Sequence, residues 1–255
     1  MRAQEYPKAA RGTDLFKDII CSLTLISKIP LGFLSGNSAD FRKAAQHFPA
    51  AGYASFAVWY VSFSLFSAIF TDSIVPVVLS LALVYYIFNL FHFDGFLDSI
   101  DGLLSQKPRE EVLRIMKLGN IGPTALFFGS LYLFLKVYLA SNTPVLYFLP
   151  VFVIARWGMS FSASISRPAS QSGLGSMIAF GKKSCLVCST FYVLPLFALG
   201  TPWLTAVLAV SVLAIDLILV KSVEARIGGL TGDVFGLINE INEIAILLIL
   251  FGVKP

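Results

Sequence analysis

Long apolar runs alternate with short polar connections along most of the chain. Seven of these runs have, or nearly have, the length that a helix needs to cross a hydrocarbon core of about 30 Å. They cover about residues 48–70, 74–93, 121–140, 145–164, 185–199, 203–220 and 238–252, of which the fifth and the seventh are short. Ahead of them, residues 13–34 place charged and apolar side chains at helical spacing up to Pro30, which predicts an amphipathic helix at the membrane interface.

The composition of the 255 residues is that of a membrane protein, because 56% are hydrophobic and only 13% are charged. These values exclude an ordinary soluble domain. We therefore expect one all-α membrane-embedded domain over residues 1–255, a polytopic bundle of about seven transmembrane helices plus the amphipathic helix. We interpret the net charge of +4 as a sign of how the chain is oriented in the membrane, and we expect no nucleic-acid partner.

Basic residues are distributed unequally between the connections. Of 19 Lys and Arg, seven precede the first apolar run, and four, three and two lie in the connections after the second, fourth and sixth runs. The other three connections contain none. By the positive-inside rule, this pattern predicts a multi-pass protein of the cell (inner or plasma) membrane with a cytoplasmic N-terminus and an outer C-terminus.

Two basic residues lie inside the predicted spans. Lys136 is near an outer end, so we expect its side chain to reach the interface. Arg156 is deeper, where a charged side chain by default marks a functional site or an ion pair.

An acidic motif lies between His92 and Gly102, directly after the second apolar run. Asp94, Asp98 and Asp101 are spaced i, i+4, i+7, so on a helix they fall on one stripe about 60° wide. Like charges on one face repel, which indicates that a cation neutralises them. Carboxylate oxygens are hard ligands that suit Mg²⁺.

An ordinary solvated helix end is the alternative explanation of the acidic motif. Such an end needs no fixed register and usually mixes Lys with Glu. This motif has only Asp among its charges and includes Gly95 and Gly102, which let a backbone or a ligand approach closely. A metal-binding stripe is therefore the favoured interpretation.

A second polar block lies between Arg226 and Glu243, on the same predicted side of the membrane. Its glycines suit a loop whose backbone N–H groups bind phosphate at a helix start. A Gly-rich turn with a capping residue would explain Thr231 alone. It would not explain two Glu and two Asn at the start of an apolar run, where polar side chains are costly unless they line a cavity.

Two further stretches are polar. Residues 164–177 have the composition of a loop. Residues 109–123 begin as a basic helix and break near Gly122 and Pro123. For that helix, a solvated surface and a contact with phosphate remain equally open.

These blocks, in this order, resemble the cobalamin synthase family over nearly the whole chain. The resemblance rests on His92 to Gly102, Arg109 to Gly122, the Gly-Leu-Gly at residues 173–175, and Gly228 to Glu240. The chain departs from the family pattern at Leu118-Gly119-Asn120, where an acid and a base are usual, and at Ser170-Gln171-Ser172.

The resemblance implies an adenosylcobinamide-GDP ribazoletransferase that uses Mg²⁺. Such an enzyme transfers the phosphocobinamide group from adenosylcobinamide-GDP to α-ribazole or α-ribazole 5′-phosphate and releases GMP. The partners are then these two substrates and the lipid bilayer, and the active site faces the cytoplasm. The oligomeric state, a homo-oligomer included, stays open.

Three sets of site residues are expected. The metal ligands are Asp94, Asp98, Asp101 and Asp233. A carboxylate that orients or deprotonates the attacking hydroxyl is expected from Asp98, Asp101 or Glu240. The residues expected to contact the substrates are His92, Arg114, Lys117, Arg156, Arg167, Arg226, Thr231, Asn239 and Glu243.

Two other functions fit parts of the pattern. A CDP-alcohol phosphatidyltransferase also carries an Asp-rich helix, but it normally has a fourth Asp and an Ala-Arg pair where this chain has Phe96-Leu97. A cation-coupled transporter would explain Asp216 and Arg156 within apolar runs. A transporter usually places its ionisable groups near the midplane and has related halves, whereas most ionisable groups here gather at one face.

Overall fold

The computed structural model describes residues 15–31, 34, 41–72, 74–170, 178, 180–199 and 201–253. Within these ranges every extended element is helical, and the one β contact is an isolated bridge between Pro168 and Leu230. Among the described residues, six helical segments are long and apolar enough to cross a membrane. The prediction of an all-α polytopic membrane bundle is confirmed.

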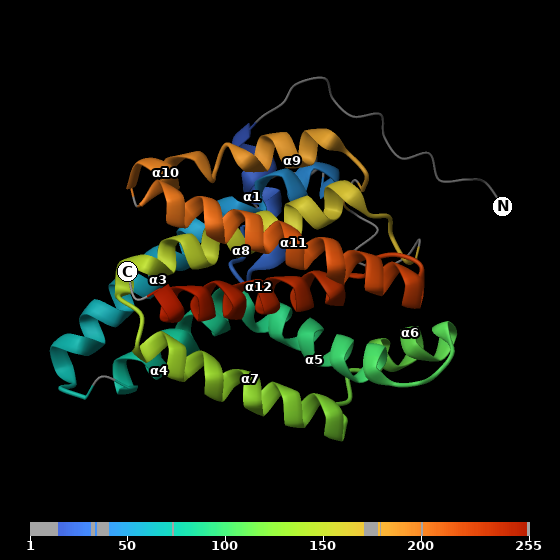
Figure 1. Cartoon of the computed structure of the whole chain (residues 1–255), viewed down its shortest axis with the longest axis horizontal. Coiled ribbons are helices and arrows are strands. Elements are labelled where there is room, and N and C mark those ends of the chain that lie inside the picture. Colours follow the sequence, from blue (N-terminus) through green and yellow to red (C-terminus); the bar gives the residue numbers. More distant parts are fainter. Residues whose placement is uncertain are drawn as a thin grey trace.

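The helices follow one another along the chain as labelled in Figure 1. Their bounds are α1 (Leu15–Ile26), η2 (Phe41–His47), α3 (Phe48–Ile69), α4 (Ile74–Val84), η3 (Tyr85–Asn89), α5 (Leu90–Leu104), α6 (Arg109–Lys117), α7 (Pro123–Ser141), η4 (Val145–Tyr147), α8 (Phe148–Ile165), α9 (Lys183–Thr190), α10 (Leu194–Leu199), α11 (Pro202–Ile227) and α12 (Gly232–Val253).

The fifth predicted span, which was expected to be short, is not one continuous helix. Residues 183–199 form two short helices, α9 and α10, separated by a turn at residues 191–193. Pro195 explains the break, because proline lacks an N–H and its ring clashes with the carbonyl four residues earlier. The seventh predicted span, by contrast, is the full-length helix α12.

The two short helices still connect opposite ends of the bundle. Before α9, the Gly181 N–H donates to the Ala163 carbonyl near the end of α8. At the other end, the Thr205 hydroxyl, near the start of α11, donates to the Leu196 carbonyl. The pair therefore runs alongside its neighbours even though neither helix is long enough to span alone.

The second span is longer than the apolar run predicted. Helix α4, the π-helical turn η3 and helix α5 form one continuous stretch from Ile74 to Leu104. Asp94, Asp98 and Asp101 therefore lie within this helix and do not follow it. The π-turn displaces the helical register next to the acidic motif, a location where such turns are often functional.

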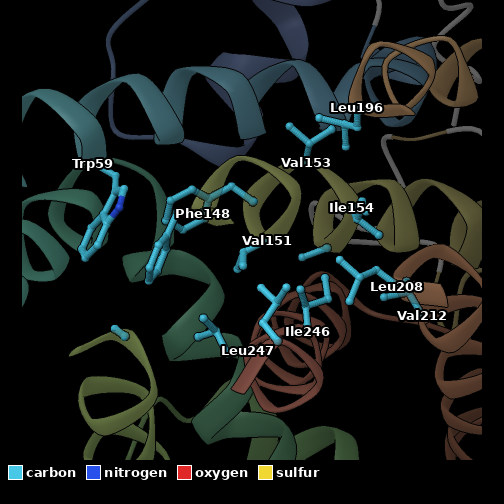
Figure 2. Close-up of a cluster of buried hydrophobic side chains, with 14 of the residues drawn as sticks. Trp59, Phe148, Val151, Val153, Ile154, Leu196, Leu208, Val212, Ile246 and Leu247 are labelled. Carbon is cyan, nitrogen blue, oxygen red and sulfur yellow. The ribbon is translucent and has the colours of Figure 1, made fainter. Parts of the chain in front are cut away.

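Helices α8 and α12 form the centre of the bundle. Figure 1 shows α12 lying between α8 and α11 on one side and α5 and α7 on the other. Gly52 lets α3 approach α8, because a Cβ there would lie 2.6 Å from the Phe152 carbonyl oxygen. Figure 2 shows the apolar cluster that results, in which the Trp59 and Phe148 rings stack with centroids 4.1 Å apart.

The predicted amphipathic helix is present as α1, and Thr13 and Asp14 lie outside the described residues. One face of α1 is buried, including Ile20, Cys21 and Ile26. This face packs against η2 and α3. The helix is thus attached to the bundle through its apolar face.

Candidate active site

A cavity of about 940 Å³ opens beside the start of α12. Its walls come from α1, η2, the start of α3, η3, α5, α6, α8 and α12, which are far apart in the sequence. The lining residues that carry polar chemistry are Thr24, Ser27, Lys28, Tyr86, His92, Asp94, Lys117, Ser170, Thr231 and Asp233. Apolar side chains, including Phe48, Met159 and Phe235, complete the lining.

Two glycines bring α5 and α12 together at the cavity. A Cβ on Gly95 would lie 2.7 Å from the Asp233 backbone, and a Cβ on Gly236 would lie 2.4 Å from the His92 carbonyl oxygen. Only glycine allows such close approach. The contact places Asp94 of α5 and Asp233 of α12 in the lining of the same cavity, and their predicted role as metal ligands stays a prediction.

His92 also lines the cavity, and its side chain is 5% exposed. Neither ring nitrogen has a hydrogen-bond partner among the residues that the structure describes. A buried polar group without a partner is costly, so this imidazole is available to a bound molecule. The predicted contact of His92 with a substrate stays a prediction.

Asp101 has a different environment from the other carboxylates of the stripe. Its two oxygens accept hydrogen bonds from the Gly122 N–H at 2.5 Å and the Ala125 N–H at 2.8 Å. These N–H groups belong to the N-cap and the first turn of α7, so Asp101 stabilises the start of that helix. Both oxygens keep a free lone pair, and the roles predicted for Asp101 in catalysis and metal binding stay predictions.

The four predicted metal ligands are arranged around the junction of α5 and α12. Asp94 and Asp233 line the cavity, and half-buried Asp98 lies one turn further along α5 than Asp94. Among the described residues, no three His, Cys, Asp or Glu side chains converge closely enough to hold a metal ion as they stand. The donor set consists of hard carboxylate oxygens, which suits Mg²⁺.

Glu240 and Glu243 lie deeper in α12, in a buried network of side chains. Both are fully buried. The Lys136 ammonium donates to Glu243 at 2.6 Å and to Glu240 at 3.1 Å. Arg156 contributes a second ion pair, at 3.4 Å from Glu243. Two cations thus face two carboxylates, and the network is balanced in formal charge.

Neutral side chains complete this network. The Tyr85 hydroxyl donates to Glu240 at 2.6 Å, and the Tyr132 hydroxyl also donates to Glu240. Asn89 donates to Glu243 at 3.0 Å and accepts from Arg156 at 2.7 Å. Asn239 donates to Glu243 at 3.0 Å. Tyr85 and Asn89 are the first and last residues of η3, so the π-turn presents both to α12.

The network tests what was expected of Lys136 and Arg156. The expectation that the Lys136 side chain reaches the interface is wrong. The side chain is 1% exposed, because two buried carboxylates attract it inward. Arg156 is in an ion pair, which confirms one of the two explanations given for it. The structure does not place Glu240, Glu243, Asn239 or Arg156 in the lining of the cavity. Their predicted catalytic and substrate-binding roles stay predictions.

The model of the cobalamin-5-phosphate synthase family matches residues 18–251. The chain belongs to this family. A protein of Fervidobacterium nodosum named adenosylcobinamide-GDP ribazoletransferase is 35% identical over 239 residues, which are 93% of this chain and 98% of that protein. A protein of Thermosipho africanus with the same name is 35% identical over 87% of this chain and 93% of its own length. No solved structure matches the chain significantly.

Four more residues were predicted to contact the substrates, and two of them line the cavity. Lys117 lines the cavity, and Thr231 does so too while its hydroxyl accepts from the Val234 N–H at 3.3 Å. Arg167 donates to the Gly228 carbonyl at 2.9 Å, and Arg226 donates to the Ser105 carbonyl. Neither arginine is among the lining residues of the cavity. They hold loops in place in this structure, and their predicted contact with substrate is untested.

Arg114 pairs with a neighbour on the outer face of α6. Its guanidinium donates to both Glu111 oxygens, at 2.6 and 2.8 Å. This hydrogen bonding holds the pKa of the Glu111 carboxyl below its usual value. The side chain is exposed and lies outside the cavity lining, so α6 offers Lys117 to the cavity and Arg114 to solvent. The Gly-Leu-Gly at residues 173–175 lies outside the described residues.

Several residues near the site were missed by the sequence reasoning. Lys28 and Tyr86 line the cavity, and Arg109 donates to the Ile227 carbonyl at 2.7 Å beside the Gly-rich turn. For Lys136, a signal existed, because charged residues inside spans usually pair with one another. For Lys28, none existed, since a charged residue at the end of an amphipathic helix normally faces water.

Proposed function

We propose that this protein transfers the phosphocobinamide group from adenosylcobinamide-GDP to α-ribazole or α-ribazole 5′-phosphate and releases GMP. Membership in the cobalamin-5-phosphate synthase family and the names of its relatives support this reaction. They weigh against a CDP-alcohol phosphatidyltransferase and a cation-coupled transporter. The structural observation that carries the proposal is the cavity in which carboxylates of α5 and α12 meet.

The cavity suits large substrates that are partly apolar and partly anionic. Its volume is at the upper end of the range of about 300–1,000 Å³ typical of ligand pockets. Apolar side chains such as Phe48 and Phe235 would contact the ring systems of the substrates. At the polar end, Lys117 would contact a phosphate group, and His92 would hydrogen-bond a polar group of a substrate.

We place Mg²⁺ at Asp94 and Asp233, with Asp98 on the adjoining turn of α5. A divalent ion there would neutralise the diphosphate and stabilise the GMP that leaves. The fit rests on the hard oxygen donors and on the cavity that both Asp94 and Asp233 line. Asp101 remains a further candidate, since each of its oxygens has one lone pair left.

In the transfer step, a ribose hydroxyl of the acceptor attacks the phosphorus that carries the cobinamide group. The new P–O bond replaces the bond to the second phosphate, and GMP departs with that oxygen. The hydroxyl proton passes to a carboxylate. We assign this role to Asp98, because Asp101 already accepts from two N–H groups and Glu240 accepts from five side chains.

Growth of a bacterium that lacks its own ribazoletransferase tests this proposal. On medium containing cobinamide and α-ribazole, cells that need cobalamin should grow when they produce this protein. An Asp94→Asn variant, inserted in the membrane at the same level, should not support growth. If the wild-type protein is present in the membrane and the cells still need added cobalamin, the proposed reaction is wrong.

A further inference from the structure

The C-terminal end of α1 is attached to the π-turn of the second span. The Lys28 N–H donates to the Ile87 carbonyl at 2.7 Å. A π-turn interrupts the regular ladder of helical hydrogen bonds, so a carbonyl within it can accept a bond from another element. The attachment therefore depends on η3 and fixes the end of α1 beside α5.

The side chain of Lys28 is positioned by the same turn. Its ammonium lies 4.7 Å from the centroid of the Tyr86 ring, within the range of a cation–π interaction. Lys28 and Tyr86 both line the large cavity. The aromatic ring thus orients a lysine that would otherwise sample many rotamers, and it does so at the cavity wall.

The cavity also has a polar group that is ready for a ligand. His92 is 95% buried and lines this same space, and neither of its ring nitrogens has a partner in the described part of the chain. On another wall, α6 contributes Lys117. Among the described lining residues, Lys28 and Lys117 are the cations and Asp94 and Asp233 are the anions. A divalent ion at the carboxylates would leave the lining positively charged, which suits an anion.

We propose that Lys28 binds a phosphate group of a nucleotide substrate, and that α1 is therefore a wall of the active site. The identity of the nucleotide, a guanosine phosphate ester, rests on the proposed function. In this arrangement Tyr86 is a positioning residue, because it acts through Lys28. The phosphate lies between Lys28 and Lys117, with the carboxylates of α5 and α12 on a third side.

Equilibrium binding of GMP to the purified protein in detergent with Mg²⁺ tests the proposal. Lys28→Met should weaken GMP binding by about 10- to 100-fold, the effect of losing one hydrogen bond to a charged group. Lys28→Arg should bind GMP nearly as well as the wild type. Tyr86→Leu should weaken GMP binding, but by less than Lys28→Met does. Tyr86→Phe should leave GMP binding unchanged, since phenylalanine keeps the ring.

Lys221→Met is the matched control, because Lys221 is an exposed lysine of α11 outside the cavity lining. The proposal would be overturned if Lys28→Met and the wild type bound GMP with equal affinity. It would also be overturned if Lys221→Met lost as much GMP affinity as Lys28→Met, because that result would indicate an effect of overall charge. A loss that appears only when anionic lipid is present would assign Lys28 to a lipid headgroup and would also overturn it. If Lys28→Met does not fold, the GMP affinities of Tyr86→Leu and Tyr86→Phe test the proposal in its place.

The outcome is separate from that for the proposed reaction. If the wild type releases no GMP from adenosylcobinamide-GDP but Lys28→Met still binds GMP more weakly, the reaction is wrong and the phosphate site stands. If the reaction occurs and Lys28→Met has an unchanged KM, the phosphate site is wrong and the reaction stands.

Discussion

Replacing Lys136 by methionine should destabilise the protein strongly. The ammonium contacts Glu240, Glu243, Tyr85 and Tyr132 at 2.6 to 3.1 Å, and the side chain is 1% exposed. Methionine fills a similar volume but removes the charge. Two buried carboxylates would then share the single positive charge of Arg156.

Two estimates of the cost can be compared. Four hydrogen bonds inside a membrane protein, at about 0.6 kcal/mol each, amount to roughly 2.4 kcal/mol. Leaving a buried charge uncompensated costs about 3–5 kcal/mol. The second effect should dominate, because the network is balanced by two cations and two anions and cannot reach water. We therefore expect the free energy of unfolding to fall by about 3–5 kcal/mol in Lys136→Met.

The double variant Lys136→Met/Glu243→Gln separates charge from contact. It restores a balance of one cation and one anion, Arg156 and Glu240, while it removes still more hydrogen bonds. Denaturant unfolding in detergent should show that it is more stable than Lys136→Met alone, with an interaction energy of about 1–3 kcal/mol. Lys221→Met serves as the exposed control. If the two single effects simply add, or if Lys136→Met behaves like the control, the charge-balance reasoning is refuted.

Three further predictions concern the site and the topology. Asp98→Asn should lower turnover at least ~10²-fold and leave stability equal or higher, because one of the repelling carboxylates is neutralised; near-normal turnover, with Glu111→Gln as the control, would remove Asp98 from the active site. EDTA should abolish activity and excess Mg²⁺ or Mn²⁺ should restore it, and full turnover in chelator would contradict the metal assignment. A reporter fused after Pro255 should be active only outside the cytoplasm, and activity inside would mean that α9 and α10 do not cross the membrane.

The sequence predicted the helical bundle and the acidic face of α5 because both depend on local patterns. Apolar length defines a span, and the spacing of Asp94 and Asp98 defines a helix face. Pro195 was also a readable signal for the break between α9 and α10, although length alone had suggested a single span. In these cases the deciding physics lies within one segment of the chain.

The direction of the Lys136 side chain could not be obtained in this way. Snorkelling and ion pairing are both open to a lysine in a span, and the choice depends on Glu240, which is 104 positions away and on another helix. The same holds for Lys28, whose place at the cavity depends on a π-turn that sequence patterns do not reveal. Contacts across the bundle, and not local periodicity, decide such positions.

The central claim is tested most directly with the purified protein, adenosylcobinamide-GDP, α-ribazole and Mg²⁺. Both products should be measured in the same reaction, GMP by chromatography and the joined corrinoid by mass spectrometry. We expect equal amounts of the two, and no GMP when α-ribazole is omitted. GMP released without a joined corrinoid would show hydrolysis in place of transfer, and no GMP at all would contradict the proposed reaction.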